Sequence, residues 1–235
     1  MIIKERKRWY FFIRAVCHRI IFAALGGLRT LHADRVPLEG PVIFAPVHFS
    51  FLDPPLVACG SPRQITFMAK KELFDAPIFG SLIRSLGAFP ISRGAGDKEA
   101  IKMAMSLLEQ NRAMLMFPEG TRGFGENLHP MTSGILMLVR KTGAKVVPVG
   151  INGTQIVLPK GKSKPKRHRI LIAFGEPIDY KELVEKLGAA GAKAQFNLIL
   201  ESSLIALCEE IGLPLKASPK EEAPENASEE FKTLG

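Results

Sequence analysis

The sequence predicts a single α/β domain in which helices flank a largely parallel or mixed central sheet, preceded by an amphipathic helical element. From residue 40 onward, short apolar segments bounded mostly by Gly or Pro alternate with segments of helical periodicity. Strands that are apolar on both faces and separated by helices are typical of a parallel sheet covered on both sides. The 235 residues are enough for one such domain with a substantial core.

The N-terminal segment predicts an amphipathic helix. Apolar residues recur at helical spacing from Trp9 to Leu25, and Gly26 and Gly27 end or bend the helix. The residues off this stripe include Arg8, Arg14, His18 and Arg19. The stripe fits a helix packed on the domain core and equally one in a membrane interface, and the basic flank favours the membrane. Its apolar run falls well short of the roughly 20 residues of a spanning helix and lacks a clear cleavage site, so we expect a retained segment.

Six strands are predicted, over residues 41–46, 64–69, 87–92, 113–118, 145–150 and 169–175. Helices are predicted over 97–108, with Asp97 as N-cap, over the apolar segment 133–143, and over 179–188 and 196–213. Beyond Pro214 the chain is rich in Glu, Lys, Ala and Ser, which is typical of a frayed tail. We therefore expect a membrane-binding element over 1–30, the α/β domain over 31–213 and a polar tail over 214–235.

The charge distribution indicates an anionic partner. The chain has 32 Lys and Arg against 23 Asp and Glu, and residues 160–169, "KGKSKPKRHR", contain six basic residues and no acid. Such an excess suits nucleic acid, an anionic membrane surface or a phosphorylated substrate. Because the basic clusters lack interleaved aromatics outside the N-terminal stripe and no nucleic-acid motif is present, we expect no nucleic-acid partner.

The three cysteines, Cys17, Cys59 and Cys208, lie far apart among apolar neighbours. This spacing contains neither a disulfide framework nor a Cys-x-x-Cys metal site, so we expect buried thiols and a reducing compartment.

The stretch "VHFSFLDPP", residues 47–55, is the first candidate for chemistry. His48 and Asp53 directly follow a predicted strand, where α/β proteins place their sites. If Asp53 bonds one imidazole nitrogen, the other nitrogen is left to accept a proton. No Gly-x-Ser-x-Gly elbow marks a serine nucleophile, and only His129 and Glu119 are loose candidates for a metal site. A base acting directly on a substrate hydroxyl is the option that remains.

Two further strand ends carry charged residues. In "FPEGTRG", residues 117–123, Gly120 permits close approach of a ligand, Arg122 suits a phosphate, and Glu119 can bind a hydroxyl or hold Arg122. In "GAFPISRG", residues 87–94, a predicted strand leads to Arg93. Each stretch alone could be an ordinary turn with surface charges. Three such strand ends in one chain favour a common site.

The order and spacing of these motifs resemble the 1-acylglycerol-3-phosphate (lysophosphatidic acid) acyltransferases of the glycerolipid acyltransferase superfamily, over residues 38–180. The family's His-x4-Asp and Phe-Pro-Glu-Gly-Thr-Arg motifs look like 48–53 and 117–122, and its Val-Pro-Val looks like 147–149. Its Gly-x-x-Phe-x-x-Arg block is matched imperfectly, because Pro90 stands where the family usually has its aromatic residue. Only Arg93 is carried over from that block.

The resemblance implies that His48, oriented by Asp53, takes the proton from the 2-hydroxyl of lysophosphatidic acid. The oxygen then attacks an acyl thioester directly, which gives phosphatidic acid without a metal or cofactor. The residues that the resemblance assigns to substrate binding are Lys70, Arg93, Glu119, Gly120, Thr121 and Arg122. The intact site argues against a non-catalytic lipid-binding membrane protein.

The resemblance also implies partners and a location. The acyl donor would be a thioester of acyl carrier protein or of coenzyme A. The enzyme would be peripheral or monotopic on the cytoplasmic face of the cell membrane, against an anionic surface. Related acyltransferases that use glycerol-3-phosphate or another lysophospholipid share these motifs and stay open as alternatives.

Overall fold

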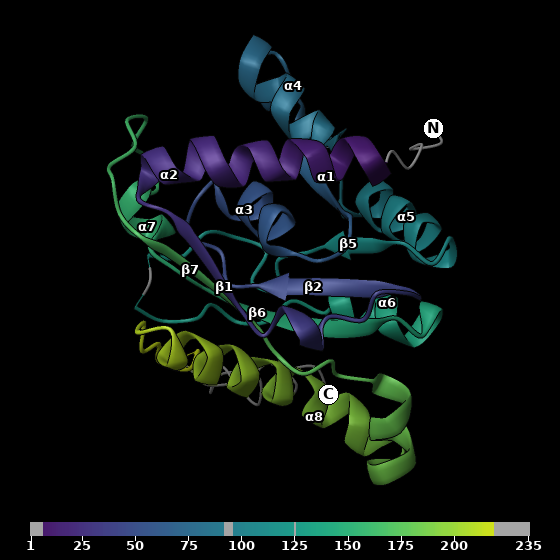
Figure 1. Cartoon of the computed structure of the whole chain (residues 1–235). Helices are drawn as coiled ribbons and strands as arrows, with labels where there is room; N and C mark the ends of the chain where they lie inside the picture. The colour runs from purple at the N-terminus through teal and green to yellow at the C-terminus, as the bar shows by residue number, and fades with distance from the viewer. Residues whose placement is uncertain (1–6, 92–95, 125, 219–235) are drawn as a thin grey trace, which may run out of the picture.

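The computed structural model describes residues 7–91, 96–124 and 126–218, which are drawn in colour in Figure 1. Within these residues, seven strands form one sheet in the order β1-β7-β6-β2-β5-β3-β4. The strands are β1 (Leu28–Leu31), β2 (Val42–Pro46), β3 (Ile65–Lys70), β4 (Ala88–Ile91), β5 (Ala113–Leu115), β6 (Lys145–Asn152) and β7 (Ile170–Phe174). Neighbouring strands are parallel except β6 and β7, which are antiparallel. The predicted α/β fold with a mixed, largely parallel sheet is confirmed.

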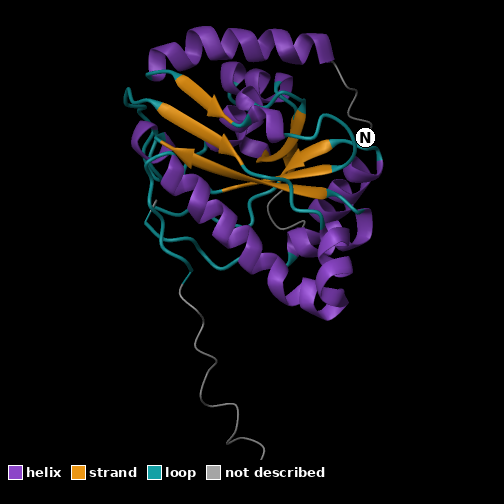
Figure 2. Cartoon of the chain, turned by 60° about the horizontal axis from the view of Figure 1, so that its bottom comes forward, coloured by secondary structure: helices purple, strands orange, loops and turns teal. Residues whose placement is uncertain are grey.

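Helices cover both faces of this sheet. They are α1 (Lys7–Val16), a π-helical turn (Cys17–Ile21), α2 (Phe22–Leu25), α3 (Asp53–Gly60), α4 (Pro77–Ser85), α5 (Gly96–Glu109), α6 (Gly134–Thr142), α7 (Thr154–Val157) and α8 (Tyr180–Glu210). Helices α1, α3 and α4 pack together on one face, and α6 and α8 lie on the other (Figure 1). Figure 2 shows the sheet between these two layers.

The six predicted strands are present, with every end within three residues of its predicted position, and β1 is an addition. β1 pairs with β7 in parallel, with Leu28 opposite Ile170. Its sequence, "LRTL", is short and directly follows the glycines that end the N-terminal helix, so its periodicity predicts no strand. The sheet therefore begins at residue 28, inside the segment 1–30 that the sequence assigns to the membrane-binding element.

Helix α3 is also absent from the sequence prediction, because "DPPLVACG" contains two consecutive prolines. Pro54 and Pro55 occupy the first turn of the helix, where a missing N–H breaks no helical hydrogen bond. The predicted helices 179–188 and 196–213 are two parts of the long element α8. Gly188, with a φ of 71° and a ψ of 165°, marks the kink between them.

The N-terminal helix is confirmed, but its apolar residues are divided between two environments. Tyr10 is buried and donates a hydrogen bond from its hydroxyl to the Ala58 carbonyl of α3, at 2.7 Å. Arg14 Nη1 donates to the Ser61 carbonyl, at 2.6 Å. Trp9 and Phe12, which belong to the predicted stripe, are 48% and 57% exposed. In the part of the chain that the structure describes, no helix has the length and apolarity to cross a bilayer.

The three cysteines are buried and unpaired by disulfides, as their apolar neighbours predict. The chain also stays in the fold beyond Pro214, because Leu215 is buried and Lys216 bridges to Asn127. Residues 219–235 of the predicted tail lie outside the described residues.

The strand order brings the candidate residues to one edge of the sheet. β2 lies between β5 and β6 and is parallel to both, with Phe44 opposite both Leu115 and Val147. The carboxyl ends of parallel strands meet at a common edge, which is where open α/β sheets place their sites. The loop that follows β2 carries His48, and the loop that follows β5 carries Glu119 and Arg122.

Candidate active site

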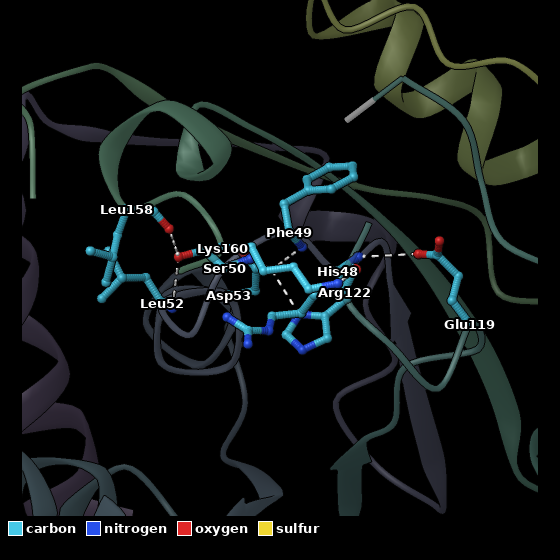
Figure 3. A network of polar contacts seen from close by, with 9 residues as sticks. All are labelled: His48, Phe49, Ser50, Leu52, Asp53, Glu119, Arg122, Leu158 and Lys160. Atoms are coloured by element: carbon cyan, nitrogen blue, oxygen red, sulfur yellow. Dashed lines mark hydrogen bonds and ion pairs between the residues drawn. The ribbon is translucent and has the colours of Figure 1, made fainter. Parts of the chain in front are cut away.

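His48, in the loop between β2 and α3, forms a hydrogen-bonded pair with Asp53, the first residue of α3. His48 Nδ1 lies 2.9 Å from Asp53 Oδ2, and Asp53 is fully buried (Figure 3). The same carboxylate oxygen accepts hydrogen bonds from the backbone N–H groups of Phe49 and Ser50, at 2.6 and 2.7 Å. Its position in the first turn of α3 also suits a negative charge. An ionised Asp53 makes Nδ1 the protonated nitrogen and leaves Nε2 as a proton acceptor.

Phe117 fixes the plane of the histidine ring. Its ring stacks on the imidazole of His48 with centroids 3.6 Å apart and planes inclined by 16°. The His48 side chain is 15% exposed, so its neighbours cover most of the ring. Phe117 was part of the quoted motif but not among the predicted site residues, because an aromatic residue after a strand is usually core.

Glu119 joins three segments of the site. It is 4% exposed, and its Oε1 accepts from the His48 backbone N–H at 3.2 Å while its Oε2 accepts from the His129 backbone N–H at 2.9 Å. Within the described residues it makes no ion pair with Arg122, which removes one of its two predicted uses. Its role in binding a substrate hydroxyl stays a prediction. Both oxygens already hold the loops that surround His48.

Burial raises the pKa of Glu119 to about 7, against the opposing effect of the two backbone N–H donors. Because folding then favours the protonated carboxyl, the contribution of Glu119 to stability is fully present below pH 4.5 and is lost as the pH rises through about 7. We expect this group alone to lower the free energy of unfolding by about 3 kcal/mol over that interval. Glu119→Gln should remove that pH dependence in urea unfolding experiments. Glu126→Gln, at an exposed position, is the control and should keep the pH dependence of wild type. Equal pH dependence in wild type and Glu119→Gln would contradict the raised pKa of Glu119.

Gly120 and Thr121 form an exposed turn beside Glu119. Gly120 N donates to the Phe117 carbonyl at 3.2 Å, and its φ of 67° lies in the left-handed region that favours glycine. Both residues are exposed, as a role in substrate contact requires.

Arg122 stacks on an aromatic residue of the His48 loop. Its guanidinium carbon lies 3.8 Å from the centroid of the Phe51 ring. The next residue, Gly123, donates its N–H to the His48 carbonyl at 2.8 Å. Figure 3 shows Arg122 and His48 within this one network. The structure thus brings Arg122 to the same site as the His48–Asp53 pair.

An apolar cleft of about 180 Å³ opens beside His48. Its other lining residues are Phe51, Pro54, Pro55, Phe67, Met68, Ala69, Lys70, Leu73, Phe79, Ile83 and Phe117. Lys70 is the last residue of β3 and is exposed. Apart from His48, it is the one residue with a charged side chain among those that line the cleft. Arg93 lies outside the described residues.

The structure also shows what the residues considered for serine or metal chemistry contact. The Ser50 hydroxyl donates to the Leu158 carbonyl at 2.8 Å and accepts from Leu52 N at 3.2 Å, so it is engaged structurally. Among the described residues, no group of three or more His, Cys, Asp and Glu is arranged to hold a metal ion. The His129–Glu119 contact involves the histidine backbone rather than its ring.

The fold and the site define an α/β enzyme that holds an oriented histidine at the carboxyl edge of its sheet, beside an apolar cleft and an arginine. The family model for the acyltransferases matches residues 28–152, more than half of the chain. The chain belongs to the acyltransferase family.

Individual relatives agree with this assignment. The chain is 30% identical over 201 residues to the 1-acyl-sn-glycerol-3-phosphate acyltransferase of Streptococcus pneumoniae. The matched region covers 84% of this chain and 72% of the relative. It is 28% identical over 183 residues to the enzyme of the same name from Bacillus subtilis, covering 76% and 89%. The crystal structure of the 1-acyl-sn-glycerophosphate (LPA) acyltransferase PlsC from Thermotoga maritima is similar with a TM-score of 0.69 and 25% identity, covering 88% of this chain and 84% of that one.

Proposed function

We propose that this protein transfers a fatty acyl group from an acyl thioester to the 2-hydroxyl of 1-acylglycerol-3-phosphate, which yields phosphatidic acid. The observation that carries the proposal is the His48–Asp53 pair, held at an apolar cleft in one network with Arg122. The names of the bacterial relatives support this choice of acceptor.

In the proposed reaction His48 acts as a general base. Its Nε2 accepts the proton of the 2-hydroxyl while the oxygen attacks the thioester carbonyl, and the new ester bond forms as the carbon–sulfur bond breaks. The thiolate leaves and takes up the proton from the imidazolium. Asp53 keeps the imidazole in the required tautomer and stabilises its positive charge. Because the Ser50 hydroxyl is already engaged, the transfer proceeds without an acyl-enzyme intermediate.

Each part of the substrate is assigned to the residues of the site that match it chemically. The guanidinium of Arg122 holds the phosphate, with Lys70 and Arg93 as further cations, and the turn at Gly120 and Thr121 contacts the glycerol. An acyl chain lies in the apolar cleft. The acyl donor is a thioester of acyl carrier protein or coenzyme A, and neither a metal nor another cofactor takes part. The lipid acceptor places the enzyme at an anionic membrane surface, on its cytoplasmic face.

Arg122→Ala should raise the KM for the phosphorylated acceptor by about 10- to 100-fold, because charge-assisted hydrogen bonds of this kind contribute about 1.5–3 kcal/mol. The measurement is the initial rate as a function of acceptor concentration. Arg84→Ala is the matched control, since Arg84 also lies over a ring, 4.7 Å from that of Phe74, but on α4. A KM equal to that of the control would remove Arg122 from phosphate binding.

The proposed function is tested by offering the purified protein two acceptors, 1-acylglycerol-3-phosphate and glycerol-3-phosphate, each with acyl carrier protein and coenzyme A thioesters. The expected product is phosphatidic acid from the first acceptor. Preferential acylation of glycerol-3-phosphate would assign the chain to the related acyltransferases instead, and no transfer with any pair would indicate a non-catalytic lipid-binding protein.

A further inference from the structure

Residues 160–169, which we term the basic loop, form an exposed segment of a single charge sign. Every residue of the loop is exposed. Its basic residues are Lys160, Lys162, Lys164, Lys166, Arg167 and Arg169, and it contains no acid. None of them makes an ion pair with any residue that the structure describes. These charges are therefore available to an external anionic partner.

The basic loop is attached at two functionally distinct places. At its start, Lys160 Nζ donates to the Arg122 carbonyl at 3.0 Å and lies 4.9 Å from the centroid of the exposed Phe124 ring. At its end, His168 N donates to the carbonyl of Leu25, the last residue of α2, at 2.7 Å. A Cβ at Gly26 would lie 2.5 Å from the His168 carbonyl oxygen, so the two backbones are in close contact there. The loop thus connects the rim of the site to the end of the N-terminal helix.

The N-terminal helix exposes aromatic side chains along its outer side. Trp9 and Phe12 are 48% and 57% exposed, and their rings contact each other with centroids 5.7 Å apart. On α4, which packs against α1, Ile78 is 88% exposed. Figure 1 shows α1, α2 and α4 on the same side of the molecule, with the basic loop reaching past the end of α2. Large exposed apolar side chains combined with unpaired cations are typical of interfacial membrane binding.

We propose that the basic loop is an anionic-lipid-binding element that docks the enzyme on a bilayer together with the aromatic side of the N-terminal helix. The helical segment 7–25 is roughly 28 Å long at 1.5 Å per residue. Aromatic side chains near one end and cations beyond the other fit an extended flat surface better than the compact surface of an acidic protein. The proposal depends on the proposed function only for the lipid nature of the acceptor.

This arrangement has a consequence for the acceptor. Lys160, at the start of the loop, donates a hydrogen bond to the backbone of Arg122, the residue proposed to hold the phosphate. Lipid headgroups bound by the loop therefore lie next to the rim of the site.

The test measures binding of the full chain to sedimenting vesicles of phosphatidylcholine alone and of phosphatidylcholine with phosphatidylglycerol. The loop variant combines Lys162→Gln, Lys164→Gln, Lys166→Gln and Arg167→Gln, and it keeps Lys160 and Arg169. Basic residues near an anionic surface each strengthen binding roughly fivefold, so we expect binding to anionic vesicles to weaken by about 100-fold or more. The control removes the same charge on α6 and α8, with Arg140→Gln, Lys141→Gln, Lys186→Gln and Lys193→Gln, and should bind like wild type.

Undiminished binding of the loop variant to anionic vesicles would overturn the proposal. If that variant also lost transfer from acyl carrier protein selectively, the loop would be assigned to an acidic protein partner instead. A vesicle-free assay with a water-soluble short-chain lysophosphatidic acid, run once with a coenzyme A thioester and once with an acyl carrier protein thioester, keeps the two hypotheses separate. Wild type and loop variant should be equally active with each donor that wild type uses. A wild type that is inactive with both donors would contradict the proposed function, but it would not affect the vesicle-binding result.

Discussion

Replacing His48 by alanine should lower kcat for acyl transfer by about 10²–10⁴-fold, the usual contribution of a general base. The 2-hydroxyl then has no positioned proton acceptor, while the rest of the site persists. Asp53 Oδ2 still accepts from the N–H groups of Phe49 and Ser50, so the loop stays closed. The measurement pairs the initial rate of phosphatidic acid formation with thermal unfolding, which should change little.

His129→Ala is the matched control for that experiment. His129 lies in the neighbouring loop and contacts the site through its backbone N–H, which bonds Glu119 at 2.9 Å and survives the substitution. This variant should keep the wild-type rate within a few-fold. If His48→Ala were as active as His129→Ala, His48 would not be the base.

Asp53→Asn should impair both catalysis and stability. Asp53 Oδ2 receives three donors, from His48 Nδ1 and from the backbone N–H groups of Phe49 and Ser50. In asparagine the carboxamide oxygen must take that place, so the amide NH2 falls at Oδ1, a buried position without a hydrogen-bond partner among the described residues. Two buried donors are then unsatisfied, which should lower the free energy of unfolding by about 1–3 kcal/mol.

The catalytic effect of Asp53→Asn comes from charge. A neutral side chain no longer stabilises the imidazolium that forms during transfer, so kcat should fall by roughly 100-fold or more. Rates and urea unfolding curves measure the two effects separately. Asp75→Asn, at an exposed position after β3, removes the same charge and should change neither. A wild-type kcat in Asp53→Asn would show that the carboxylate only holds the loop.

The fold was largely predictable because six of its seven strands lie in apolar runs bounded mostly by Gly or Pro. The failures have local causes. β1 has only four residues and is a strand because it pairs with β7. The local sequence does not encode this pairing between distant segments. Pro54 and Pro55 suggest a turn, yet both fit the first turn of α3. The apolar stripe of the N-terminal helix predicts that Trp9 shares one environment with the other apolar residues of the stripe. In the structure Trp9 is exposed, whereas its neighbour Tyr10 is buried by packing on α3.

The residues of the site were largely predictable from the sequence, but the contacts between them were less so. The spacing of His48 and Asp53 and their place after a predicted strand make the pair a candidate, and the resemblance to the acyltransferases assigns it. The structure places the two side chains in contact. The stacking of Phe117 on His48 depends on β2 and β5 being neighbours, which spacing along the chain does not express. For the same reason the sequence does not predict the hydrogen bonds that both Glu119 oxygens accept from backbone N–H groups. The carboxylate alone suggests a ligand for the substrate.

Direct transfer by an oriented histidine is most directly tested by thiol release in a single turnover. The purified full chain is mixed with a stoichiometric amount of the thioester that it uses, of coenzyme A or of acyl carrier protein, first without and then with 1-acylglycerol-3-phosphate, and free thiol is followed over time. We expect thiol release only after the acceptor is added, in step with phosphatidic acid formation. A burst of one thiol per enzyme without acceptor would show an acyl-enzyme intermediate and contradict the role proposed for His48.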